Sequence, residues 1–473
     1  MHSIKSALHS PRIVAAAVLG LGGIATYLIN FPGSMEDDSF AQLLEGRTGS
    51  YSFWHPPVMS WLLGLSDALP GPAAGWFVLL EMLLAFGALI GVLWMARRVS
   101  WATAAAAGVM LFLPQLLMLQ AVVWKDALFA NACVGAFVCL GLAAEHWRRV
   151  RLRFAMLGLS VVLLCLAVLT RQNGFVILPF AVVGLWIVAA KREGSGRTGA
   201  VYGAALLAAS SLLGWGAHEF FMTRWDGTPA REQQVKILWL YDITGMVRRE
   251  PEIGLGSLER DDPHLRQVIL DEGVRRWSPV KNDTLEVSPR IVAALDAAPW
   301  FALWNQWFEL VVSHPGNYLA VRGELFWWVF QSPDVGQCHP FHVGDEGDPD
   351  EMKELGAVTR LDARDKALWR YGDVFEYTPA FWHGAYAAIA LVVLVLVLKR
   401  RRPGDIAMAS LIGATGAFTG TFFVISIACD YRYLYVIDLT ALAGVLYVTC
   451  EWREFRSLFE KKRGPEGPLV KTK

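Results

Sequence analysis

The sequence predicts an all-α polytopic membrane protein with about ten transmembrane helices, interfacial helices and an extracytoplasmic α-rich domain. Of the 473 residues, 54% are hydrophobic and 18% are charged, and the mean hydropathy is +0.37. The apolar residues form blocks of membrane-spanning length. Basic clusters fall at alternate connections between these blocks. The formal net charge is zero, and we expect no nucleic-acid partner.

The predicted spans are apolar blocks that are each long enough, or nearly so, to cross about 30 Å of hydrocarbon. The first block follows a basic start, and no small-x-small cleavage site precedes the acidic stretch after it. We therefore expect an uncleaved signal anchor. The shorter run 58–69 follows two prolines and predicts a helix at the outer interface. The blocks lie at residues 12–31, 73–96, 102–123, 127–144, 154–170, 175–190, 199–219, 380–398, 406–428 and 431–450.

The basic clusters predict the orientation of the chain. The positive-inside rule places them, and both termini, in the cytoplasm. We therefore expect a multi-pass protein of the cytoplasmic (inner) membrane with an extracytoplasmic active face. The clusters are Lys5 with Arg12, Arg97 with Arg98, and residues 146–153, 191–197, 399–402 and 460–464.

The longest polar interval divides the chain into four predicted parts. Turn signals and mixed polarity predict a folded extracytoplasmic domain, and its tryptophan-rich part, residues 298–333, predicts helices along the membrane surface. Cys338 and Cys429 both face the predicted outer side, and the sequence leaves open whether they pair. The parts are a transmembrane module at 1–219 with its first outer loop at 32–56, the domain at 220–378, transmembrane helices at 379–450 and a cytoplasmic tail at 451–473.

Three consecutive acids follow the first span on the predicted outer face. Glu36, Asp37 and Asp38 can form a solvated acidic loop, or a carboxylate among them can act as a general base. His55, in the run "WHPP", can bind a phosphate or an acceptor, although a histidine beside prolines is more often structural. The acids lack further fixed ligands, so no metal site is predicted, and a need for a divalent cation is left open.

Cations gather at the outer ends of spans, where the positive-inside rule predicts few. Lys125, Arg171 and Arg432 can each be a snorkelling anchor, but three together favour a site for an anionic head group such as a phosphate. Asp126 adjoins the first of them, and Asn173 lies in a turn beside the second. A carboxylate that deprotonates a hydroxyl, with cations that stabilise a departing phosphate, meets the needs of transfer from an activated phosphate donor.

These motifs resemble the GT-C superfamily of membrane glycosyltransferases, in particular the family 39 and aminoarabinose transferase type. The likeness covers the first span, the acidic loop, "HPPVMSWL" and the hydrophobic hairpins up to about residue 220. The motifs "WKD", "R-x-N-G" and "Y-D-I-x-G" look like those of a bacterial subgroup of the superfamily. The chain departs from the better-known pattern at His55, where "KPP" has lysine, and at "TRQNG".

The resemblance implies an inverting glycosyltransferase that transfers a hexosyl or pentosyl group from a polyprenyl-phosphate donor. The acceptor would be a cell-envelope glycan, lipid or protein. By position, Asp38 becomes the catalytic base, with Asp37 second, and Lys125 and Arg171 become ligands of the donor phosphate, assisted by Arg432.

Two other classes of protein compete with this hypothesis. A transporter or lipid flippase would carry ionisable groups near the bilayer midplane, broken spans and an internal repeat. The charges instead lie at one face, and the sequence shows no repeat. A non-enzymatic scaffold, or a catalytically inactive relative, is the third class.

Overall fold

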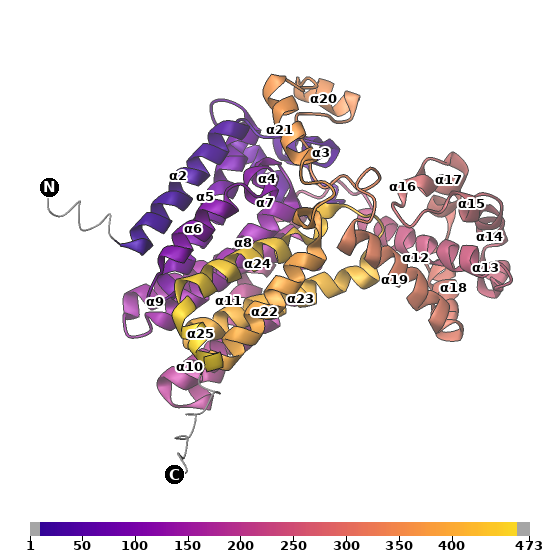
Figure 1. The fold of residues 1–473 in the computed structure, drawn as a ribbon. Coiled ribbons are helices and arrows are strands. Elements are labelled where there is room, and N and C mark those ends of the chain that lie inside the picture. Colours follow the sequence, from indigo (N-terminus) through magenta and orange to yellow (C-terminus); the bar gives the residue numbers. More distant parts are fainter. Residues whose placement is uncertain (1–9, 461–473) are drawn as a thin grey trace, which may run out of the picture.

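The computed structural model describes residues 10–460, and these residues form helices joined by loops (Figure 1). Within this range there are isolated β-bridges but no β-strand. The prediction of an all-α membrane protein is confirmed. Lys5 and the tail at 461–473, which the orientation argument used, lie outside the described residues.

Within residues 10–460, nine helices are long and apolar enough to cross a membrane. They coincide, within a few residues at each end, with nine of the predicted spans. Short 3₁₀ turns, η2 (Gly174–Ile177) and η5 (Tyr431–Leu434), precede two of them. The helices are α2 (Pro11–Asn30), α5 (Ala73–Met95), α8 (Lys125–Glu145), α9 (Val150–Thr170), α10 (Leu178–Glu193), α11 (Gly196–Met222), α22 (His383–Arg400), α23 (Pro403–Ile425) and α24 (Tyr435–Cys450).

The predicted span at 102–123 is bent. Helix α6 (Trp101–Met110) ends before Pro114, and α7 (Pro114–Leu117) with η1 (Leu119–Ala121) continues at an angle of 70°. Leu113 has the extended backbone that a following proline imposes, and proline cannot donate the next helical hydrogen bond. The two pieces together give a tenth span if they are counted as one.

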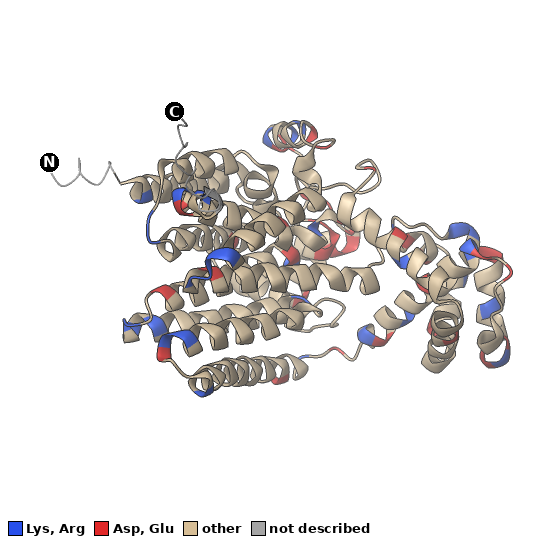
Figure 2. Ribbon diagram, turned by 60° about the horizontal axis from the view of Figure 1, so that its bottom comes forward, with Lys and Arg blue, Asp and Glu red and all other residues tan. Residues whose placement is uncertain are grey.

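Charged residues collect at the ends of the long helices and leave their middle parts largely free of charge (Figure 2). At one end, Arg12 donates to the backbone after α5, and the Arg97 N–H donates to Glu451 at 2.7 Å. Arg400 pairs with Asp405 at 2.6 Å and also contacts Glu451. Arg12, Arg97 and Arg400, from three of the predicted cytoplasmic clusters, therefore share one end of the spans. The assignment of that end to the cytoplasm stays a prediction.

The chain after α2 forms two short helices that lie against each other. The acidic triplet begins α3 (Asp37–Thr48), and α4 (Pro57–Asp67) starts at a proline and matches the predicted helix at 58–69. Gly46 and Gly64 face each other so closely that a Cβ on Gly46 would overlap backbone atoms of α4. This close approach fixes α3 against α4.

Residues 230–331 form a lobe beside the long helices (Figure 1), with an apolar core of its own built from residues 237–325. The predicted helices at 298–333 are present as α18 and α19. The lobe contains α12 (Ala230–Arg249), α13 (Gly256–Asp261), α14 (Pro263–Val268), η3 (Ile269–Gly273), α15 (Val274–Arg276), α16 (Asp283–Glu286), α17 (Pro289–Ala297), α18 (Trp300–Ser313) and α19 (Pro315–Gln331). The boundaries of the four predicted parts stay predictions.

The chain then returns to the start of the molecule. Helices α20 (Pro349–Leu355) and α21 (Ala363–Asp373) lie near α3 (Figure 1), and Arg47 of α3 donates to the Leu355 carbonyl at 3.0 Å. After η4 (Pro379–Phe381) the chain enters α22, and α25 (Trp452–Glu460) follows α24. Cys338 and Cys429 form a disulfide, with their Cα atoms 5.6 Å apart, which answers the question that the sequence left open.

The glycine contact between α3 and α4 can be tested by adding one methyl group. We expect Gly46→Ala to destabilise the protein by about 1–3 kcal/mol, because the methyl group has no room and the helices must separate. The measurement is thermal unfolding in detergent. The matched control is Gly87→Ala in α5, where a Cβ meets nothing within 4 Å. Equal melting temperatures for the two variants would contradict the close approach.

Candidate functional site

The Asp38 carboxylate lies among three basic side chains at the end of the spans opposite the Arg12 and Arg400 clusters. Lys125 Nζ is 3.2 Å from Asp38 Oδ2, and Arg432 Nη2 is 2.9 Å from the same oxygen. His55 Nε2 lies 3.4 Å from the other oxygen, Oδ1. Segments almost 400 positions apart in the sequence thus meet at one carboxylate.

Local structure explains why these side chains converge. Lys125 is the first residue of α8, and Arg432 lies in the tight turn η5 that begins the last span. Ser39 of α3 accepts a bond from the Glu36 N–H at 3.3 Å and donates to the Val123 carbonyl at 2.7 Å. The start of α3 is therefore attached to the chain just before Lys125.

His55 is oriented by both neighbours. Its Nδ1 lies 2.7 Å from Lys125 Nζ, and an ammonium group can only donate. Nδ1 is therefore the acceptor, and the ring proton resides on Nε2, where it points at Asp38. The histidine predicted from "WHPP" thus lies in direct contact with the predicted base.

The charges around Asp38 decide its protonation state. Burial alone would raise the pKa of this carboxyl, but the charge of Lys125 and the hydrogen bond with His55 lower it, and the net pKa lies well below the ordinary range. Asp38 is therefore ionised at any physiological pH. Its side chain is still 30% exposed, so a hydroxyl group can reach it.

The two neighbouring acids behave differently from Asp38. Glu36 contacts Arg432, while Asp37 forms no ion pair with a basic residue of the described chain. Burial and the adjacent Asp38 charge raise the pKa of Asp37. The structure therefore brings Glu36 and Asp38 to the cations and leaves the second predicted base, Asp37, apart from them.

Arg171 joins the cluster through Asp126. Arg171 Nη2 lies 3.0 Å from Asp126 Oδ1, and Arg432 Nε lies 3.9 Å from Asp126 Oδ2. The Arg171 guanidinium also stacks 5.0 Å from the centre of the Tyr433 ring, a cation–π distance. The buried Asp126 thus links two cations, which keeps both near the Asp38 group. Each of the three predicted cations is only 10–11% exposed.

Asn173 does not contact these charges. Its Nδ2 donates to Thr421 Oγ1 of α23 at 2.7 Å, which holds the turn after Arg171 against α23. Asp430, which sequence reasoning did not single out, pairs with Arg432 at 3.3 Å. It lies in the same run "CDYRY" as Arg432, so proximity in the sequence was the signal that could have identified it.

A second missed group holds η5 in place. His383 Nδ1 contacts Asp438 Oδ1 and its Nε2 contacts the Tyr431 carbonyl, both at 2.8 Å. His383 thus connects the Asp438 carboxyl group to the Tyr431 carbonyl through its two ring nitrogens. The Tyr431 hydroxyl donates to Asp438 at 2.5 Å, and its ring stacks on His383 with centroids 4.0 Å apart. Tyr431 is thus held at both ends, next to Arg432.

The hydrogen-bond donors of Lys125, Arg171 and Arg432 suit an anion. The part of the chain that the structure describes contains no group of three or more His, Cys, Asp or Glu side chains placed to hold a metal ion. The planar or tetrahedral donors of the three cations match the oxygen atoms of a phosphate. In this structure these donors are occupied by the carboxylates of Glu36, Asp38, Asp126 and Asp430. The fold and site define an all-helical membrane protein with a charged cluster at one end of its spans.

Comparisons with known proteins give a weak likeness in structure. No protein-family model and no curated protein matches the chain. The archaeal oligosaccharyltransferase AglB from Archaeoglobus fulgidus, in complex with an inhibitory peptide and a dolichol-phosphate, is similar at 14% identity and a TM-score of 0.41. The match covers 95% of this chain and 52% of that chain. The apo form of the A. fulgidus oligosaccharyltransferase matches at 14% identity and 0.42, covering 94% and 52%. The chain thus spans about half the length of these proteins.

The group around His383 gives a testable expectation. Asp438→Asn replaces a carboxyl oxygen that contacts the buried His383 ring or the Tyr431 hydroxyl, so we expect a loss of about 1–3 kcal/mol in the free energy of unfolding. The measurement is thermal or denaturant unfolding in detergent. The control is Thr440→Val two residues further along α24, whose buried hydroxyl has no hydrogen-bond partner among residues 10–460. A loss in Asp438→Asn no larger than in Thr440→Val would show that these hydrogen bonds contribute nothing.

Proposed function

We propose that the protein is an inverting glycosyltransferase that uses a polyprenyl-phosphate sugar on the outer face of the cytoplasmic membrane. Its acceptor is a glycan, lipid or protein of the cell envelope. The observation that carries the proposal is the Asp38 carboxylate in contact with Lys125 and Arg432. A base and the cations that can hold a leaving phosphate are therefore neighbours, as the sequence resemblance to GT-C enzymes implies.

The proposed reaction is a single displacement. The acceptor hydroxyl oxygen attacks the anomeric carbon, a new glycosidic C–O bond forms, and the bond from the anomeric carbon to the phosphate oxygen breaks. The electron pair leaves with the polyprenyl phosphate, whose charge Lys125, Arg171 and Arg432 stabilise. Asp38 takes the hydroxyl proton.

Binding of the donor would also activate the base. Without a ligand, Lys125 and Arg432 contact Asp38, and the Lys125 charge lowers the pKa of its carboxyl group. A donor phosphate competes for the same cations, and as they turn to it, Asp38 loses the charges that keep it a weak base. Burial, which raises the pKa, then has the larger effect. The carboxylate becomes a stronger base only when a donor is present.

Two further observations support the proposed arrangement. Beside the cluster lies a cavity of about 130 Å³ between α4, α9 and α11, lined by Phe53, Pro56, Leu169 and Gln172 among others, which gives a lipid chain an apolar surface near the cations. Cys429 of the Cys338–Cys429 disulfide is separated from η5 by one residue. Disulfides persist in oxidising compartments. Together with the basic clusters at the opposite end, the disulfide supports an extracytoplasmic site, with residues 220–378 as the extracytoplasmic domain.

The proposal is tested by profiling envelope glycans and lipids by mass spectrometry. Cells that lack the protein are compared with cells complemented by the wild type or by Asp38→Asn. We expect one sugar mass to vanish on deletion, to return with the wild type and to stay absent with the variant, since an amide cannot take the proton. Normal transfer by Asp38→Asn would overturn the assignment of the base.

Binding of undecaprenyl phosphate to purified protein provides the control for folding. Asp38→Asn removes the carboxylate that competes for the cations, so we expect it to bind at least as tightly as the wild type. Lys125→Met removes a charged donor and should weaken binding by about tenfold or more. Loss of binding in Asp38→Asn would mean that its inactivity reflects misfolding.

The pH dependence of the rate tests the activation of Asp38 by the donor. In the free protein the pKa of Asp38 is far below its ordinary range, so kcat/KM should show no acid limb from this group near pH 4. In the donor complex the pKa of Asp38 is higher. As the pH is lowered, kcat should therefore begin to fall at a higher pH than kcat/KM does. Acid limbs at the same pH in both profiles would show that the donor does not change the pKa of Asp38.

A lipid flippase is the second candidate function, and one residue favours it. Glu81 is completely buried in the span α5, and neither carboxylate oxygen has a hydrogen-bond partner within residues 10–460. Ionisable side chains inside spans often mark transport pathways. Envelope masses that stay unchanged on deletion, under conditions of expression, would favour this function over transfer.

A further inference from the structure

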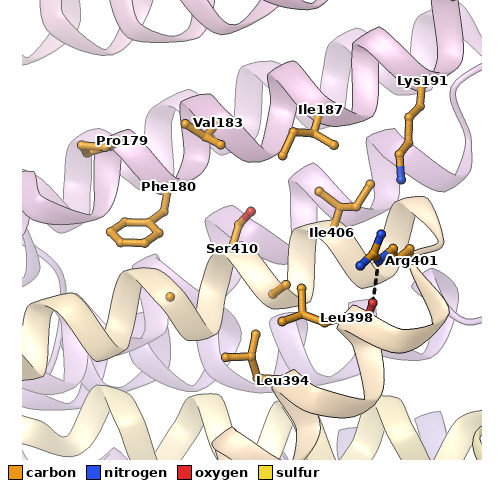
Figure 3. A pocket seen from close by; sticks show the side chains of 12 residues that line it. Pro179, Phe180, Val183, Ile187, Lys191, Leu394, Leu398, Arg401, Ile406 and Ser410 are labelled. Atoms are coloured by element: carbon orange, nitrogen blue, oxygen red, sulfur yellow. Dashed lines mark hydrogen bonds between the residues drawn. The ribbon is translucent and has the colours of Figure 1, made fainter.

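A groove runs along the face of the transmembrane helices, from Pro179 near the start of α10 to Lys191 at the end away from Asp38. It has a volume of about 540 Å³ and lies between α10, α22 and α23 (Figure 3). Its walls are apolar, with Phe180 and Ile187 on α10 and Leu394 on α22. Small residues of α23, Ala409 and Gly413, line it too, and the Phe180 ring packs against Gly413.

Two cations lie together at one end of this groove. The side chains of Lys191 and Arg401 point toward each other across it (Figure 3). Neither forms an ion pair with an acidic residue in the part of the chain that the structure describes. Two positive charges that face each other at the edge of an apolar surface repel, and an anion between them relieves the repulsion.

The backbone directs one of these cations to the groove. Arg401 ends α22 in the left-handed conformation, with φ of +60°, which a residue with a Cβ seldom adopts. Its Nε donates to the Leu398 carbonyl at 2.8 Å (Figure 3). This bond fixes the guanidinium group at the mouth of the groove and leaves its terminal N–H groups for another acceptor.

We propose that the groove binds an anionic diacyl phospholipid. The phosphate lies between Lys191 and Arg401, and the acyl chains cover the apolar walls formed by α10, α22 and α23. A phosphate accepts several hydrogen bonds from a guanidinium and an ammonium at once, which a zwitterionic headgroup with its own cation does less well. Basic pockets between transmembrane helices on the cytoplasmic side are suited to such headgroups.

This site is separate from the proposed glycosyl-transfer site. Lys191 and Arg401 belong to the clusters 191–197 and 399–402, which the charge distribution places in the cytoplasm. The lipid would therefore come from the inner leaflet, and it would join α10 of the N-terminal module to the hairpin of α22 and α23. Its role is that of a bound structural lipid, and it takes no part in the transfer step.

The experiment is native mass spectrometry of the full-length protein in detergent, titrated with phosphatidylglycerol or phosphatidylcholine of identical acyl chains. We expect the wild type to retain phosphatidylglycerol about tenfold better, as expected for one charge-assisted contact. Lys191→Gln/Arg401→Gln should reduce retention of phosphatidylglycerol to the level of phosphatidylcholine. Ala409→Leu, which fills the groove but keeps both charges, should weaken retention of both lipids.

The matched control is Arg148→Gln/Arg151→Gln, which removes two charges from the same end of the spans outside the groove. It should bind phosphatidylglycerol as the wild type does. No preference for phosphatidylglycerol in the wild type, or equal losses in the two double variants, would overturn the proposal. If undecaprenyl phosphate displaces phosphatidylglycerol at equal concentration, the groove takes the carrier lipid and the assignment to a diacyl phospholipid is wrong.

Discussion

The ion cluster around Asp38 is the interaction on which the arrangement of the molecule depends. Charges that are largely buried are costly unless they are paired, so Lys125, Asp126, Arg171 and Arg432 must find partners. Those partners come from different spans and from the short helix α3. The starts of α3, α8 and η5 therefore have to meet at one point, whatever the rest of the chain does.

Neighbouring contacts make that meeting point rigid. Ser39 ties α3 to the residues before α8, and the glycine contact ties α3 to α4, which follows His55. The His383–Asp438 pair holds Tyr431, and with it the turn that carries Arg432. Long helices set the distance between the two ends of the molecule, and these short-range contacts set the positions of individual side chains. A site that must hold several charges within 4 Å requires both the long helices and these short-range contacts.

The sequence predicts much of this fold because span length and charge alternation are local properties of the chain. It also singled out Asp38, His55 and the cations, which the structure brings together, because cations at the outer end of a span are unusual; their roles stay predictions. It did not identify the partners. Nothing in the local pattern shows that Asp37 turns away while Asp38 does not, or that His383 pairs with a residue 55 positions later. Such pairings depend on how the spans pack, and packing is not encoded in one segment.

In the proposed reaction, competition for the cations couples the donor to the proton. If a bound phosphate raises the proton affinity of Asp38, thermodynamic linkage requires that protonation of Asp38 strengthens phosphate binding by the same factor. After transfer, Asp38 carries the acceptor proton and the polyprenyl phosphate is held most tightly. Loss of that proton to solvent returns the carboxylate to Lys125 and Arg432, which weakens their hold on the phosphate. The ion pairs of the unliganded site then favour release of the product. Their strength therefore affects both the activation of the base and the rate of turnover.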